Sequence, residues 1–159
     1  MDHDPAASQM VLEGGRRAGV TGIVTSEIEE SCILRSTIAV FIGAGLGGVA
    51  RHYFNALAAA LFGTAFPWGI LAINVLGSAA MGVIVEWLAL RGSAPQDLRL
   101  FLTTGILGGF TTFSTFSLDA AVLYQRGQPG LALAYVVTSV VVAVGGLFLG
   151  MYAVRLATP

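Results

Sequence analysis

Residues 108–117 read Gly108-Gly109-Phe110-Thr111-Thr112-Phe113-Ser114-Thr115-Phe116-Ser117 and lie within an uncharged run from Leu100 to Leu118. The run has about the length of a membrane-spanning helix, roughly 20 residues. Its second half is unsuited to an ordinary lipid-facing helix, because paired glycines and Thr-Thr are weak helix formers and hydroxyl groups are crowded together. Non-helical backbone is tolerated at membrane depth only where protein or a polar cavity surrounds it. The segment therefore predicts a broken helix whose carbonyl and hydroxyl groups face something other than lipid.

The composition predicts an integral membrane protein. The 159 residues are 55% hydrophobic and 11% charged, and the mean hydropathy is +0.80. Soluble domains carry roughly 25% charged residues. We therefore expect a multi-pass protein of the cell (inner or plasma) membrane, in contact with the lipid bilayer.

Charge and cysteine usage exclude several classes of partner. Six of the nine acidic residues precede residue 31, and six arginines are scattered through the remainder. Dispersed arginines form no stripe that tracks phosphates, so no nucleic acid is expected to bind. Cys32 is the single cysteine, which excludes an internal disulfide and a cysteine metal cluster.

Apolar segments separated by turn-forming loops predict an all-α protein with four transmembrane helices. The expected spans are about residues 36–61, 68–90, 98–124 and 130–152. The first span reaches bilayer length only if it continues through Arg51, whose guanidinium then snorkels to an interface or is buried against a partner. Residues 1–34 are predicted to be a flexible polar tail, and residues 35–159 the membrane domain. Both termini are then on one side.

Glycine spacing and arginine distribution bear on packing and orientation. The pairs Gly43/Gly47 and Gly146/Gly150 have the spacing that lets helix backbones approach closely. The arginines near the span ends divide four against two between the two sides, which favours the N-terminus inside by a thin margin. Insertion in both orientations is then possible, and we hypothesise a pair of opposite orientation.

Polar and aromatic side chains recur within the predicted spans. Asn74 carries the only amide deep in a span, and it either hydrogen-bonds between helices or lines a polar path. Phe113 and Phe116 share one face of a helix restarting near Thr112, a pattern that periodicity alone assigns to core packing. Tyr135 and Ser139 share a face of the fourth span.

The spans contain parts for a small ion and none for the usual membrane enzymes. Glu86 and Asp119 lie toward span ends rather than mid-membrane, which argues against a proton-coupled transporter. No nucleophile–base set is present, so we expect no enzymatic activity. Carbonyls freed at a helix break suit a cation, whereas amide protons, hydroxyls and ring edges suit an anion. The residues alone leave both open.

Three motifs together resemble the CrcB/Fluc fluoride channels, in order and spacing. They are GAGLGGVARHY at 43–53, PWGILAINVLGS at 67–78 and GGFTTFSTFS at 108–117. The resemblance covers about residues 37–156. It implies an antiparallel, dual-topology homodimer of four-helix subunits with the third helix broken mid-membrane, and two fluoride pores.

The resemblance also implies roles for individual residues. Asn74 would hydrogen-bond fluoride at the pore mouth, and Phe113 and Phe116 would turn their ring edges toward it. Tyr135 and Ser139 would continue the path. The hydroxyls expected to join them are those of Thr115 and Ser117.

A sodium ion at the dimer interface is the one cofactor implied, held by the backbone carbonyls of Gly108 and Thr111. One departure from the pattern is Ala143, which stands one turn after Ser139 where a further hydroxyl is expected.

The function implied is passive export of cytoplasmic fluoride down its electrochemical gradient, which protects against fluoride toxicity. Two alternatives remain. One is a small dual-topology multidrug-type cation exporter, which the lack of a mid-membrane glutamate disfavours. The other is a structural membrane subunit, for which the polar third span would be an unnecessary cost.

Overall fold

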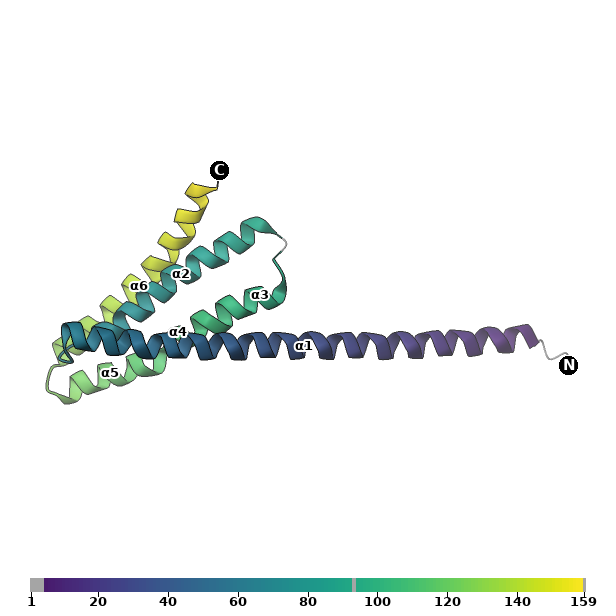
Figure 1. The fold of residues 1–159 in the computed structure, drawn as a ribbon, viewed down its shortest axis with the longest axis horizontal. Coiled ribbons are helices and arrows are strands. Elements are labelled where there is room, and N and C mark those ends of the chain that lie inside the picture. The colour runs from purple at the N-terminus through teal and green to yellow at the C-terminus, as the bar shows by residue number, and fades with distance from the viewer. Residues whose placement is uncertain (1–4, 93, 159) are drawn as a thin grey trace. The chain divides into compact units, whose positions relative to one another are not determined.

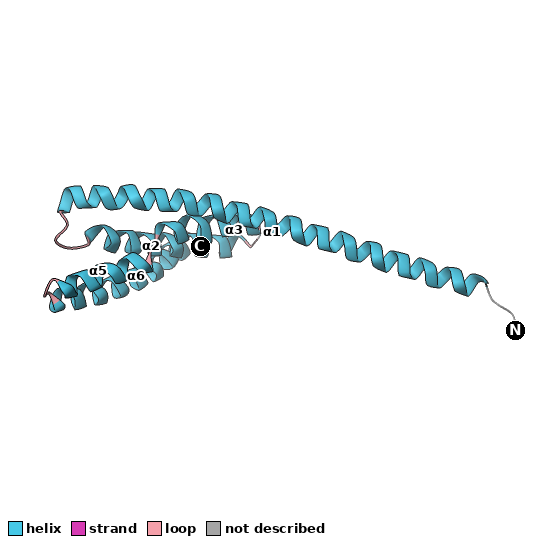
Figure 2. Cartoon of the chain, turned by 90° about the horizontal axis from the view of Figure 1, so that it is seen from below, coloured by secondary structure: helices cyan, strands magenta, loops and turns pink. Residues whose placement is uncertain are grey.

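The computed structural model describes residues 5–92 and 94–158, with side chains described from Ser31 onward. All regular elements in these residues are helical (Figure 2). They are α1 (Pro5–Phe62), α2 (Trp68–Arg91), α3 (Gln96–Leu100), the π-helix η1 (Phe101–Leu107), α4 (Gly108–Phe110), α5 (Phe113–Gln125) and α6 (Pro129–Ala157). The prediction of an all-α protein is confirmed.

Four helical segments are long and apolar enough to cross a membrane. They are Ser31–Phe62, Trp68–Arg91, Gln96–Gln125 and Pro129–Ala157. These agree with the predicted spans, and the first continues through Arg51 as its length requires. The fourth runs on to Ala157, because no helix-breaking residue follows Gly150. The protein is therefore a multi-pass membrane protein.

The chain divides into two compact units, Met1–Thr37 and Ile38–Pro159. Helix α1 begins at Pro5, so most of the segment for which the sequence predicts a flexible polar tail, residues 1–34, is helical. Proline is favourable in the first helical turn, and alanine, glutamate and leucine in the following residues are strong helix formers. The flexible character of this segment stays a prediction.

Glycines with left-handed backbone end three of the helices. Gly63, Gly92 and Gly127 have φ values of 76°, 65° and 75°, a conformation that glycine adopts without steric cost. Pro129 then starts α6 in a first-turn position, where its missing N–H has no helical partner to lose. The loops of the structure thus fall where the sequence predicts them.

Helices α2 and α6 lie side by side and run in the same direction (Figure 1). Glycines make this packing close: a Cβ at Gly82 would lie 2.9 Å from the Leu147 carbonyl carbon, and one at Gly150 would lie 3.0 Å from the Val83 nitrogen. Of the predicted pair Gly146 and Gly150, Gly150 makes such a close contact, whereas a Cβ at Gly146 would lie 3.4 Å from the Val75 carbonyl oxygen, an ordinary contact distance.

A second glycine contact joins α1 to η1 and α4. A Cβ at Gly43 would lie 2.7 Å from the Phe101 carbonyl oxygen and 2.8 Å from Gly105 Cα. A Cβ at Gly109 would lie 2.8 Å from Ala44 Cα. Neither side has room for a methyl group, so it is glycine that allows the backbones of α1, η1 and α4 to approach one another this closely.

One ion pair joins the C-terminal ends of α2 and α6. Arg155 donates from Nε to Glu86 Oε1 at 2.7 Å and from Nη2 to Glu86 Oε2 at 3.2 Å. Glu86 is buried, with 7% of its surface exposed. Its carboxylate is therefore committed to a structural contact at a span end.

Candidate functional site

The helical segment that carries residues 108–117 is interrupted at two residues. Helix α4 ends at Phe110, and Thr111 and Thr112 have extended backbone, with φ/ψ of −76°/157° and −153°/124°. Helix α5 restarts at Phe113, where the Thr112 hydroxyl accepts from the Thr115 amide at 3.3 Å. This side chain is an N-cap, which satisfies one of the amides that a helix start leaves unpaired.

Asn74 on α2 supplies hydrogen bonds in place of the helical ones that are lost at the interruption. The Thr112 amide donates to Asn74 Oδ1 at 2.9 Å, and Asn74 Nδ2 donates to the Thr112 carbonyl at 3.1 Å. In a continuous helix the Thr112 amide would donate to the Gly108 carbonyl, four residues earlier. The pairing with Asn74 thus releases the Gly108 carbonyl from its helical partner.

Arg51 on α1 binds the other side of the interruption. Its Nη1 donates to the Thr111 carbonyl at 3.2 Å, and the side chain is half-buried. The structure therefore places this guanidinium against a partner within the protein. Of the two readings left open by the sequence, burial against a partner is the one observed.

Three aromatic rings form a continuous contact from the start of α5 to α6. The ring centroids of Phe113 and Phe116 are 5.5 Å apart, and those of Phe116 and Tyr135 are 5.2 Å apart. Phe116 and Tyr135 are buried, whereas 78% of Phe113 is exposed. Within one chain, core packing therefore accounts for Phe116 but not for Phe113.

A groove of about 340 Å³ gathers most of the predicted site residues. Asn74, Phe113, Phe116 and Ser139 all line it, with Ala143 further along α6. Among the described residues, Ser139 Oγ is the one buried side-chain polar atom without a hydrogen-bond partner. A buried hydroxyl left unpaired indicates a missing water, ion or ligand at that point.

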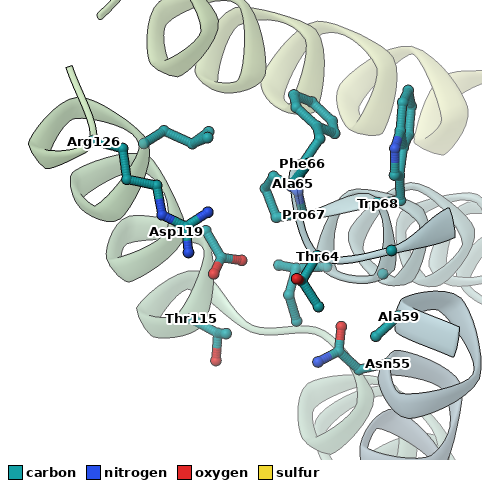
Figure 3. Close-up of a pocket in the computed structure, with 14 residues that line it drawn as sticks. Asn55, Ala59, Thr64, Ala65, Phe66, Pro67, Trp68, Thr115, Asp119 and Arg126 are labelled. Atoms are coloured by element: carbon teal, nitrogen blue, oxygen red, sulfur yellow. The ribbon is translucent and has the colours of Figure 1, made fainter. Parts of the chain in front are cut away.

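A second cavity, of about 250 Å³, lies between the end of α1, the loop before α2, and α5 (Figure 3). Thr115 and Asp119 of α5 line it, together with Arg126. The Tyr135 hydroxyl donates to Asp119 Oδ2 at 3.5 Å. Tyr135 therefore contacts both the ring of Phe116, which lines the groove, and the carboxylate that lines this cavity.

Two further predicted residues, Thr115 and Ser117, lie outside the groove. Thr115 lines the second cavity rather than the groove. Ser117 lines neither, and its hydroxyl donates to the Phe113 carbonyl within α5 at 2.9 Å.

Sequence reasoning did not single out Thr112 or Arg126. Thr112 combines a backbone pairing with Asn74 and an N-cap, and a threonine directly before the start of a helix is a signal for such a cap. Arg126 follows Asp119 by seven residues, a spacing that returns to the same helix face. That periodicity could have located it beside the carboxylate.

Comparison with known proteins gives one consistent result. The family model described as "CrcB-like protein, Camphor Resistance (CrcB)" matches residues 38–151. A protein of Nitrobacter hamburgensis named "Fluoride-specific ion channel FluC 2" is 58% identical over 116 residues, which are 73% of this chain and 94% of the relative. Proteins named "Fluoride-specific ion channel FluC" from Rhodopseudomonas palustris and Granulibacter bethesdensis are each 53% identical, over 75% and 77% of this chain and 96% of each relative. The chain therefore belongs to the CrcB-like family.

Proposed function

We propose that this chain forms a passive, fluoride-selective channel in the cell membrane. The observation that carries the proposal is the groove in which Asn74, Phe113, Phe116 and the unpaired hydroxyl of Ser139 meet. Relatives with more than half of their residues identical are named fluoride-specific ion channels. As a channel, the protein would make and break no covalent bond and would not be an enzyme.

The groove offers an anion the donors it needs without a fixed positive charge. A serine hydroxyl donates one hydrogen bond, and the edge of a phenyl ring carries partial positive charge. Fluoride is a small anion that forms strong hydrogen bonds. Several such weak donors together could take the place of the water molecules around it. Because no side chain lining the groove is charged, an ion entering it would not be trapped by a permanent ion pair.

The direction of transport follows from the chemistry of hydrofluoric acid. The neutral acid crosses bilayers and dissociates in the less acidic cytoplasm, where the anion is retained. A membrane potential that is negative inside favours exit of an anion by about 2.3 kcal/mol per 100 mV. A selective pore would therefore lower cytoplasmic fluoride without ATP or protons, and so protect the cell.

We propose further that two copies assemble in opposite orientations. The groove is open in one chain, and the ring of Phe113 at its edge is 78% exposed. A second copy would cover this ring and complete the wall of the pore. The interruption at Thr111 and Thr112 falls near the middle of the segment Gln96–Gln125. That position puts it at membrane depth, where only protein or a polar path can surround it.

A sodium ion at the interface of two copies would depend on backbone oxygens. The described residues contain no cluster of His, Cys, Asp or Glu that could hold a metal. The Gly108 carbonyl is released from its helical partner, whereas the Thr111 carbonyl accepts from Arg51 at 3.2 Å. A carbonyl oxygen has two lone pairs, so both oxygens fit the role. They would provide structural bridging between copies rather than transport chemistry.

The test is efflux from liposomes that contain the purified protein and are loaded with potassium fluoride. We expect an ionophore for potassium to trigger fluoride release, measured with a fluoride electrode, and chloride-loaded liposomes to release far less. Liposomes without protein are the control. Retention of fluoride together with export of a lipophilic cation would overturn the proposal in favour of the exporter, and neither activity would favour a structural subunit.

A further inference from the structure

The second cavity is the only one of the two described above that carries full charges. Its polar lining consists of Asn55, Thr64, Thr115, Asp119 and Arg126. Asn55 comes from the end of α1, Thr64 from the loop before α2, and the other three from α5 and its C-terminal cap (Figure 3). A polar hollow between the ends of three segments is suited to hydrated ions.

This cavity adjoins the aromatic contact that leads to the groove. Phe116 lines the groove, its ring packs on Tyr135, and the Tyr135 hydroxyl reaches Asp119 in the cavity. An anion that moved past the rings along this contact would therefore come close to the Asp119 carboxylate. A half-buried carboxylate repels an anion more strongly than an exposed one, because less water screens it.

Arg126 is the one positively charged side chain that lines the cavity. Figure 3 shows its guanidinium directed into the cavity, toward Asp119. No described residue forms an ion pair with it: Glu86 with Arg155 is the pair recorded between other helices. An arginine serving only as a membrane anchor would extend outward to the headgroups. Its inward direction indicates a role in the cavity.

We propose that Arg126 recruits anions at this end of the pathway and offsets the repulsion from Asp119. The ligand class is a small monovalent anion, and the inference rests on the proposed fluoride function. Because the guanidinium is exposed and unpaired, it keeps its capacity to attract an entering ion. The nearby carboxylate prevents Arg126 from binding that ion so tightly that it cannot leave.

The test compares fluoride efflux from liposomes for the wild-type protein, Arg126→Gln, Arg126→Lys and Asp119→Asn/Arg126→Gln. At low ionic strength we expect Arg126→Gln to lower the rate by about tenfold, the order expected for loss of one nearby charge. Arg126→Lys should stay within about threefold of wild type. The double variant should recover most of the lost rate, because the uncompensated carboxylate is gone.

The double variant also separates cavity charge from membrane orientation. Orientation depends on arginine and lysine and little on acidic residues, so Arg126→Gln and the double variant should insert alike. Arg99→Gln, an arginine that lies outside this cavity, is the matched control and should conduct as wild type does. Raising the salt concentration should narrow the difference between Arg126→Gln and wild type.

Each outcome decides between the two proposals. If the wild-type protein releases fluoride and Arg126→Gln matches it within twofold, the role of Arg126 is refuted and the channel stands. A double variant as slow as Arg126→Gln also refutes it, since loss of charge compensation is then not the cause. If the wild-type protein releases no fluoride, both proposals fail. Gel filtration of each variant shows whether a lost rate reflects lost assembly.

Discussion

Asn74 and Thr112 are joined by two hydrogen bonds, one in each direction, across the interruption between α4 and α5. The Thr112 amide donates at 2.9 Å and the Thr112 carbonyl accepts at 3.1 Å. The side-chain amide thus acts as a substitute for a backbone peptide. Asparagine carries its donor and its acceptor on separate atoms of one amide group, as a backbone peptide does.

Asn74→Asp tests this relationship, because it keeps the acceptor and removes the donor. The carboxylate would face the Thr112 carbonyl, so an acceptor would oppose an acceptor. We expect thermal stability to fall, by the roughly 1–3 kcal/mol that an unsatisfied buried group costs, together with loss of fluoride efflux. Melting followed by tryptophan fluorescence measures the first effect. Wild-type melting with lost efflux would instead assign Asn74 solely to the ion.

Phe113 and Phe116 should respond differently to substitution by isoleucine, because Phe113 is 78% exposed in one chain and Phe116 is buried. We expect Phe113→Ile to reduce fluoride efflux strongly while the protein melts as wild type does. Phe116→Ile should reduce both efflux and melting temperature, since shape changes in a packed core cost up to about 3 kcal/mol. Unchanged efflux in both variants would return the two rings to the core-packing reading.

The sequence was sufficient for the spans, and four of the residues that it singled out, Asn74, Phe113, Phe116 and Ser139, line the groove. Long apolar runs ended by Gly63, Gly92 and Gly127 locate the helices, because composition and turn chemistry are local properties. The pairing of Arg51 with Thr111 is different, since the two residues are 60 positions apart. A lone arginine in an apolar segment predicts a partner but does not identify it.

The contact of α1 with η1 should be intolerant of a single added methyl group. Gly43→Ala would place a Cβ 2.7 Å from the Phe101 carbonyl oxygen, so the helices must separate. We expect destabilisation of about 1–3 kcal/mol, the usual cost of overpacking. Gly45→Ala is the matched control, because nothing lies within 4 Å of its Cβ position in one chain. Equal melting temperatures for the two variants would contradict the observed packing.

Glu86 provides a test that separates the channel from the cation exporter. Its carboxylate pairs with Arg155 at 2.7 Å, so Glu86→Gln should lower the melting temperature and leave fluoride efflux per folded protein near that of wild type. The exchange Glu86→Arg/Arg155→Glu should recover part of the stability. A proton-coupled exporter needs a titrating carboxylate, so loss of all transport in folded Glu86→Gln would favour that class.

Ser139 offers the sharpest separation of stability from transport, because its buried hydroxyl has no hydrogen-bond partner in the described residues. Removing an unpaired buried polar group costs no hydrogen bond and relieves its desolvation penalty. Ser139→Ala should therefore melt at or slightly above the wild-type temperature while its fluoride efflux falls. Ala143→Ser, one turn further along the same groove, should conduct at least as well as wild type. A Ser139→Ala protein that melts early and conducts normally would mean that the hydroxyl serves the fold, and the groove would lose its best evidence for an ion.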